Sequence, residues 1–120
     1  TVLDTDVPGG SKAGVVAIIE IVALMIGKIV QCYSEERYDH PQQMRTGMFL
    51  KKGLPKSLYR PGSSTTVLIF QKERVRFAED LIRNMSRQGV ESRFSKGFGM
   101  SLVETDVKVR SSIASAVDIR

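Results

Sequence analysis

The chain has 120 residues, 42% of them hydrophobic and 26% charged, which excludes a disordered or low-complexity protein and allows at most one domain. One cysteine, Cys32, and one histidine, His40, exclude an intrachain disulfide and a zinc site of the usual Cys/His type, so we expect no metal. The net charge of +5 suits an acidic partner, but the basic residues are scattered among acids and carry no nucleic-acid-binding motif. We therefore expect no nucleic-acid partner, and an anionic membrane surface remains compatible with the charge.

The first half of the chain predicts short strands separated by turns. Residues 1–3 have the pattern of a strand end, and a glycine-rich turn follows. The apolar run at residues 13–30 approaches the length of a membrane span, but a charge such as Glu20 inside it costs about 3 kcal/mol on insertion scales. Its valines and isoleucines, with Gly27 as a break, instead predict a buried strand followed by another strand at residues 28–33.

A polar loop and a further strand are predicted next. Residues 34–43 form a turn-rich, solvent-facing loop that exposes His40, whereas Cys32 is expected to be buried as a small hydrophobic residue. Residues 44–53 predict a short strand that ends at a glycine, with Pro55 as a further break.

The second half predicts one helix between two strands. The β-branched run at residues 65–70 is a strong strand candidate, and the helix ends near Gly89. Residues 89–100 are a glycine-rich loop, and residues 102–114 alternate as a half-buried strand does. The apolar face of the predicted helix consists of Phe77, Leu81, Ile82 and Met85. The sum is a mainly β fold, a small antiparallel domain of barrel-sandwich type with one helix.

Conventional catalytic groups are not evident in this sequence. The paired carboxylates lie in polar or alternating settings typical of a surface, and His40 in its loop is a weak candidate for a catalytic triad. No glycine-rich run ends in Gly-Lys-Ser/Thr, so a P-loop is excluded. The stretch PGSST, residues 61–65, then has two interpretations: an ordinary turn that leads into a strand, or a place where the backbone itself reacts.

The reactive interpretation has a definite chemistry. A serine hydroxyl can attack the carbonyl carbon of the preceding residue when the peptide is strained and its oxygen is held by donors, and a preceding glycine minimises steric obstruction. The ester can undergo β-elimination, which cuts the chain and leaves dehydroalanine, and hydrolysis then gives a pyruvoyl group with loss of ammonia. Such a keto group forms a Schiff base with a substrate amine and is an electron sink for decarboxylation.

The spacing around these serines resembles the self-cleavage region of the phosphatidylserine decarboxylase family. Lys52-Gly53, Tyr59, Gly62-Ser63-Ser64 and Ile69-Phe70 match that region without a gap as far as the serines. Two further stretches, residues 2–29 and the pair FAEDLIRNM and VETDVKVRSSIA, are similar to family segments in the same order. The resemblance covers most of residues 2–114.

The resemblance implies a site and a division of the chain. Ser63 would become the pyruvoyl cofactor after cleavage between Gly62 and Ser63, with residues 1–62 in the β chain and residues 63–120 in the α chain. Counting back from Phe70 places Ser64 at the cleaved position instead, so Ser64 stays the second choice. The family also has a His-x-x-His-x-Pro-like stretch, which implies that residues 1–120 are the C-terminal catalytic part of a proenzyme whose upstream part carries that motif.

The implied activity is the decarboxylation of phosphatidylserine to phosphatidylethanolamine and CO2, at a membrane to which the protein binds peripherally, or otherwise in the cytoplasm. The Gly-Ser-Ser variant also occurs in related enzymes that act on amino acids, so a decarboxylase of a soluble aromatic amino acid is one alternative. A non-catalytic β-sandwich that binds a partner is the other.

Overall fold

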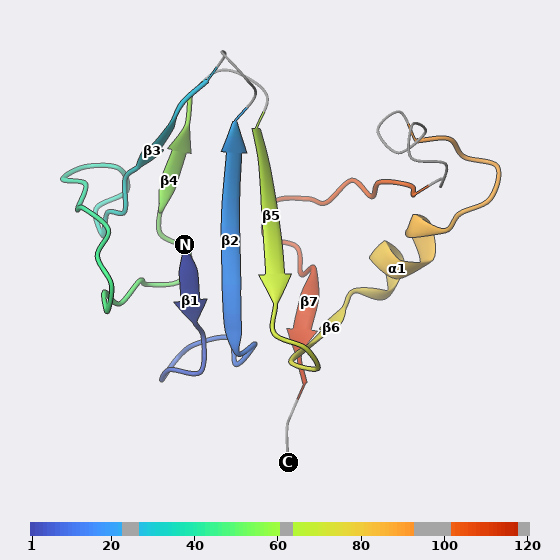
Figure 1. Cartoon of the computed structure of the whole chain (residues 1–120), viewed down its shortest axis with the longest axis horizontal. Helices are drawn as coiled ribbons and strands as arrows, with labels where there is room; N and C mark the ends of the chain where they lie inside the picture. The colour runs from blue at the N-terminus through green and yellow to red at the C-terminus, as the bar shows by residue number, and fades with distance from the viewer. Residues whose placement is uncertain (23–26, 61–63, 93–101, 118–120) are drawn as a thin grey trace. The chain divides into compact units, whose positions relative to one another are not determined.

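The computed structural model describes residues 1–22, 27–60, 64–92 and 102–117, and the chain forms two compact units (Figure 1). The first unit consists of Thr1–Leu3 and Val16–Ile69. The second consists of Asp4–Val15 and Phe70–Arg120.

A three-stranded sheet lies almost entirely in the first unit. It contains β1 (Val2–Asp4), β2 (Val15–Val22) and β5 (Ser64–Phe70) in the order β1-β2-β5, and β2 runs opposite to both neighbours (Figure 1). Two backbone hydrogen bonds join the residue before β1 to the middle of β2: Thr1 N donates to Ile18 O at 2.9 Å, and Ile18 N donates to Thr1 O at 2.7 Å. The runs rich in β-branched residues therefore form the predicted strands, because such side chains fit a pleated sheet.

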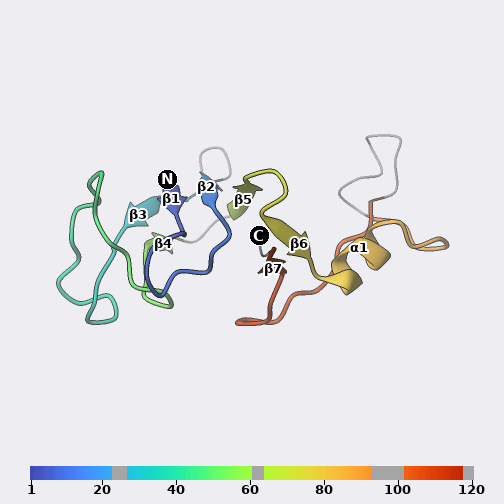
Figure 2. The ribbon, with the colours of Figure 1, turned by 90° about the horizontal axis from the view of Figure 1, so that it is seen from below.

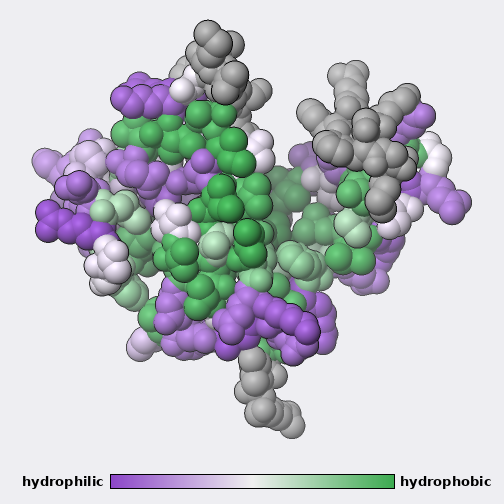
Figure 3. Space-filling view, viewed as in Figure 1, coloured by the Kyte–Doolittle hydropathy of each residue, from purple (hydrophilic) through white to green (hydrophobic). Residues whose placement is uncertain are grey.

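One face of β2 is open rather than buried. Side chains alternate along a strand, so Val15, Ile19 and Ile21 share a face, and they are 44%, 46% and 46% exposed. Val16 on the other face is only 7% exposed. Apolar surface gathers over β2 and β5 in Figure 3. The sequence predicted a buried strand here, and the structure buries Val16 but leaves Val15, Ile19 and Ile21 on the opposite face exposed.

The first unit also contains a two-stranded sheet of β3 (Ile29–Gln31) and β4 (Ser57–Tyr59). The strands pair antiparallel, with Ile29 opposite Tyr59 and Gln31 opposite Ser57. The second strand predicted from the apolar run is thereby confirmed. The strand predicted at residues 44–53 is wrong, because Gly47 and Gly53 have φ of 81° and 83°, which turns the chain out of the extended conformation.

The second unit contains a two-stranded antiparallel sheet and a short helix. β6 (Val75–Phe77) pairs with β7 (Ala114–Ala116), and α1 (Glu79–Met85) follows β6 after one residue (Figure 2). Phe77 therefore lies in a strand and not in the predicted helix, and its ring meets that of Phe70 edge to face at 5.7 Å.

The helix is shorter and more exposed than the sequence predicts. It ends at Met85 rather than near Gly89, none of its residues is buried, and Ile82 is 51% exposed. The residue before α1, Ala78, has φ −59° and ψ 139°, so the backbone is extended until that point.

The long strand predicted at residues 102–114 is wrong, since only Ala114 belongs to a strand. Val103 N instead donates to Met85 O at 3.0 Å, and Asn84 Nδ2 donates to Thr105 Oγ1 at 3.1 Å, so this segment bonds to the end of the helix. Most of the predicted loop at residues 89–100 lies outside the described residues. The predicted fold class is confirmed in the part described: mainly antiparallel β with one short helix. None of the described helical residues forms a segment long and apolar enough to cross a membrane.

Candidate functional site

The predicted cleavage segment joins β4 to β5. Gly62 and Ser63 lie outside the residues that the structure describes, and Ser64 is the first residue of β5. Tyr59, the aromatic residue of the matched spacing, is the last residue of β4. The predicted site is therefore flanked on both sides by strands of the first unit.

Side-chain and backbone bonds hold the two flanks of this segment. The Tyr59 hydroxyl lies 2.7 Å from the Thr66 Oγ1, and this hydrogen bond links β4 to β5. Arg60 N donates to Lys28 O at 2.8 Å, which extends the pairing of β3 and β4 by one step. Both ends of the segment thus belong to an ordered frame.

A polar cluster lies at the other end of β4. Lys56 Nζ lies 2.8 Å from Glu20 Oε2, 3.0 Å from Gln31 Oε1 and 2.9 Å from Ser57 Oγ. Gln31 Nε2 also donates to Glu20 Oε2 at 3.0 Å. The side chains of Lys56 and Glu20 are 16% and 12% exposed, so this ion pair is largely removed from water. It joins β2 to the start of β4.

The cluster keeps Glu20 ionised. Burial would by itself raise the pKa of this carboxyl, but hydrogen bonds from Lys56, Ser57 and Gln31 and the charge of Lys56 outweigh it, so the pKa lies below its ordinary value. A depressed pKa makes Glu20 a poor general base near neutral pH. The chemical role of the cluster is therefore to fasten strands together.

Sequence reasoning missed this pair. In the sequence, Glu20 was considered only as a charge that argues against a membrane span. Lys56 was only one of many scattered basic residues, and nothing linked it to Glu20. The available signal was the position of Glu20 within an apolar strand, because a carboxylate in such a place needs a cationic partner.

The structure gives His40 and Cys32 the settings that their sequence predicts. His40 has a side chain that is 85% exposed, and its Nδ1 lies 3.0 Å from Glu36 Oε2 in the polar loop. Cys32 is 6% exposed, as expected of a small hydrophobic residue. Both predictions are confirmed, and His40 stays a weak candidate for catalysis because its described partner is Glu36.

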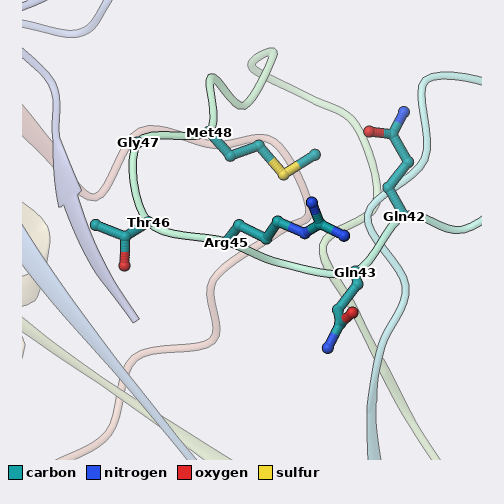
Figure 4. Close-up of a pocket in the computed structure, with 6 residues that line it drawn as sticks. All are labelled: Gln42, Gln43, Arg45, Thr46, Gly47 and Met48. Carbon is teal, nitrogen blue, oxygen red and sulfur yellow. The ribbon is translucent and has the colours of Figure 1, made fainter.

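An open hollow of about 430 Å³ lies in the loop between β3 and β4 (Figure 4). The side chains of Arg45 and Met48 extend in the same direction, toward the segment of Gln42. The remaining lining residues are Gln43, Thr46 and Gly47. The lining contains no carboxylate, thiol or imidazole, so it offers no acid, base or strong nucleophile.

Metal chemistry finds no support in the part of the chain that the structure describes. Within residues 1–22, 27–60, 64–92 and 102–117, no three side chains of the His, Cys, Asp or Glu type gather in a way that could hold a metal ion. The candidate site is therefore the β4–β5 connection predicted from the sequence, together with the described contacts at its two ends.

Comparison with known proteins matches this connection to a family. The profile of the family described as phosphatidylserine decarboxylase matches residues 1–97. The chain is 38% identical over 84 residues to the phosphatidylserine decarboxylase proenzyme of Chlamydia trachomatis, which covers 70% of this chain and 24% of that protein. The proenzyme of Chlamydia felis is 37% identical over 94 residues, covering 76% of this chain and 27% of the relative.

A proenzyme from a bacterium of another genus is also similar to this chain. That of Fusobacterium nucleatum is 34% identical over 86 residues, which is 72% of this chain and 25% of the relative. The chain therefore spans about a quarter of the length of the curated relatives that it matches. No solved structure matches it. The chain belongs to the phosphatidylserine decarboxylase family.

Proposed function

We propose that this chain is the C-terminal catalytic part of a self-processing phosphatidylserine decarboxylase. The observation that carries the proposal is the family match over residues 1–97, which includes the complete spacing from Lys52-Gly53 through Tyr59 to Gly62-Ser63. Cleavage between Gly62 and Ser63 assigns residues 1–62 to the β chain and residues 63–120 to the α chain. Ser64 is the alternative cleaved residue.

The proposed self-cleavage uses atoms of the chain and one water molecule. Ser63 Oγ attacks the Gly62 carbonyl carbon, the peptide C–N bond breaks, and the freed amine receives the hydroxyl proton. Loss of the Ser63 Cα proton then breaks the Cβ–O bond of the ester, which releases the Gly62 carboxylate and leaves a dehydroalanine. Its imine form takes up water and loses ammonia, and a pyruvoyl group remains at the new N-terminus.

The described residues fit this group in one respect, since the frame of β4 and β5 holds both ends of the segment from which it would form. The pyruvoyl group would supply an electron sink for loss of CO2 from an amino acid headgroup. The chain's histidine, His40, is exposed and paired with Glu36, so the activating base is expected from the upstream part of the proenzyme.

The proposed substrate is phosphatidylserine, met at an anionic membrane surface to which the protein binds peripherally. The net charge of +5 supports attraction to such a surface, and the exposed apolar face of β2 supports contact with a non-aqueous neighbour. The alternative is a decarboxylase of a soluble aromatic amino acid.

Release of CO2 by the purified full-length protein tests the activity. We expect release from vesicles that contain phosphatidylserine, none from free serine or aromatic amino acids, and none from the Ser63→Ala variant. Release from free amino acids alone would assign the enzyme to the soluble class. A processed protein that releases CO2 from neither would contradict decarboxylation of either substrate.

A further inference from the structure

The hydrogen bond between Tyr59 and Thr66 joins the two sheets of the first unit. Tyr59 is fixed in β4 by its pairing with Ile29, and Thr66 lies within β5 of the three-stranded sheet. Their hydroxyl oxygens are 2.7 Å apart, an ordinary distance for an O–H···O hydrogen bond. This contact therefore connects the last residue of β4 to the third residue of β5.

The bond also closes a ring of the chain. Residues 60–65 lie between its two partners, and the peptide bond between Gly62 and Ser63 belongs to that span. Attack of a serine hydroxyl on the carbonyl of the preceding residue depends on the orientation of the two groups. A segment whose two ends are held together has fewer accessible conformations than one whose ends are free. A bond outside the reacting atoms can thus raise the rate of the reaction inside the ring.

The proposed role of Tyr59 depends on its hydroxyl group and not only on its aromatic ring. The resemblance to the family requires only an aromatic residue at this position, and an aromatic ring would serve packing without a hydroxyl. Here the ring carries a hydroxyl, and a threonine stands within hydrogen-bond distance of it on the far side of the segment. The contact needs both side chains, so its contribution can be measured separately from that of the ring.

We propose that Tyr59 and Thr66 are positioning residues for self-processing, which they accelerate by bonding across the segment that is cut. This inference rests on the proposed function and adds two residues to it. Neither residue supplies an atom that reacts, so neither is required for the chemistry itself. Their loss slows cleavage without abolishing it.

The test is a double-variant cycle on the cleavage rate of freshly synthesised full-length proenzyme. Tyr59→Phe removes the hydroxyl and keeps the ring, and Thr66→Val removes the hydroxyl and keeps the shape. Each single variant is expected to slow cleavage by about three- to tenfold, the range for one net hydrogen bond. The double variant is expected to be no slower than either single one, because the same bond is lost only once. Thr66→Ser keeps a hydroxyl and is expected to restore most of the rate.

Matched controls remove the same atoms elsewhere in the first unit. Tyr38→Phe and Thr46→Val act on exposed residues of the loop between β3 and β4, and we expect the wild-type cleavage rate from both. Urea midpoints of all variants in an uncut Ser63→Ala background show whether each chain is folded under the assay conditions. A slow rate in a fully folded chain then reports positioning and not loss of structure.

The outcomes separate this inference from the proposed function. A wild-type proenzyme that is never cut contradicts the proposed function. If the wild type is cut and both Tyr59→Phe and Thr66→Val are cut at the same rate, the proposed function stands and the positioning role is wrong. Independent, multiplying effects of the two variants also overturn it, because they show that the hydroxyls do not act through a shared bond.

Discussion

The ammonium group of Lys56 lies 2.8 Å from the carboxylate of Glu20, although the two residues are far apart in sequence. Both side chains are largely shielded from water, and Gln31 and Ser57 satisfy further polar atoms of the pair. The pair connects β2 to the residue that precedes β4, the strand that leads into the predicted cleavage segment. It is the point at which the charge inside the apolar run of residues 13–30 is neutralised.

Replacement of Lys56 by methionine is expected to destabilise the chain. The substitution leaves the Glu20 carboxylate with fewer donors in a poorly hydrated place, which lowers the free energy of unfolding by about 1–3 kcal/mol. Urea titration of the uncut Ser63→Ala protein measures it. Lys72→Met is the matched control, because the Lys72 side chain is 90% exposed and its ion pair with Glu73 is 3.5 Å long. We expect that control to change the free energy by less than about 0.5 kcal/mol. Equal losses of free energy of unfolding in the two variants would show that the ion pair of Lys56 with Glu20 stabilises the chain no more than an exposed pair does.

Glu20 is expected to make stability depend on pH in the acid range. Its pKa in the folded chain lies below the ordinary value of 4.5, so its contribution is fully present above that pH. The contribution is lost as the pH falls through the lower pKa of the folded state, because the carboxylate must then bind a proton. Urea midpoints measured below pH 4.5 should therefore fall more steeply for the wild type than for Glu20→Gln. Parallel slopes for the two proteins would contradict this assignment.

Gly14 and Gly9 offer a matched pair of substitutions in the second unit. Both have left-handed backbones, with φ of 70° and 73°, so alanine costs about 1 kcal/mol or more at either position. A Cβ at Gly14 would lie 2.6 Å from Gln71 Oε1 and 3.0 Å from Arg74 Cγ, whereas a Cβ at Gly9 meets nothing within 4 Å. Gly14→Ala is therefore expected to lower the free energy of unfolding by about 1–2 kcal/mol more than Gly9→Ala.

The side chains near Gly14 have little freedom to move away. Gln71 Oε1 accepts a hydrogen bond from Val15 N at 3.2 Å, and Arg74 Nη2 lies 2.6 Å from both carboxylate oxygens of Asp6. Urea titration of the two alanine variants, in the uncut background, gives the difference. Equal losses of free energy of unfolding at the two positions would show that the side chains of Gln71 and Arg74 move away from the added methyl group at no energetic cost.

Strands formed by β-branched runs could be predicted from the sequence, because β-propensity and burial agreed there. The prediction of a strand at residues 44–53 failed because glycines with positive φ turn the chain there. Glycine adopts positive and negative φ about equally readily, so the sequence alone does not predict which sign it has. The strand predicted at residues 102–114 failed for another reason. Alternation indicates two faces but does not supply a partner strand, and this segment bonds to the end of α1 instead.

One part of the candidate site could be predicted from the sequence, and the other part could not. The segment with Gly62 and Ser63 could be found from spacing alone, since the motif is local in sequence. The contacts that frame it could not, because Tyr59 with Thr66 and Glu20 with Lys56 depend on how β4 lies against β5 and β2. A charge in an apolar strand indicates that a partner exists, but among many basic residues it does not say which one.

Intact-mass measurement of the purified full-length protein, with and without a carbonyl-trapping amine, tests directly whether the protein cuts itself and forms a pyruvoyl group. We expect two chains cut between Gly62 and Ser63, whose combined mass equals that of the uncut protein plus one water minus one ammonia, and an α chain that reacts with the amine. The Ser63→Ala variant should remain a single chain, and a cut before Ser64 would move the mass boundary by one serine. A single uncut wild-type chain that does not react with the amine, under conditions in which a control decarboxylase is cut, would show that this protein is not a self-processing pyruvoyl enzyme.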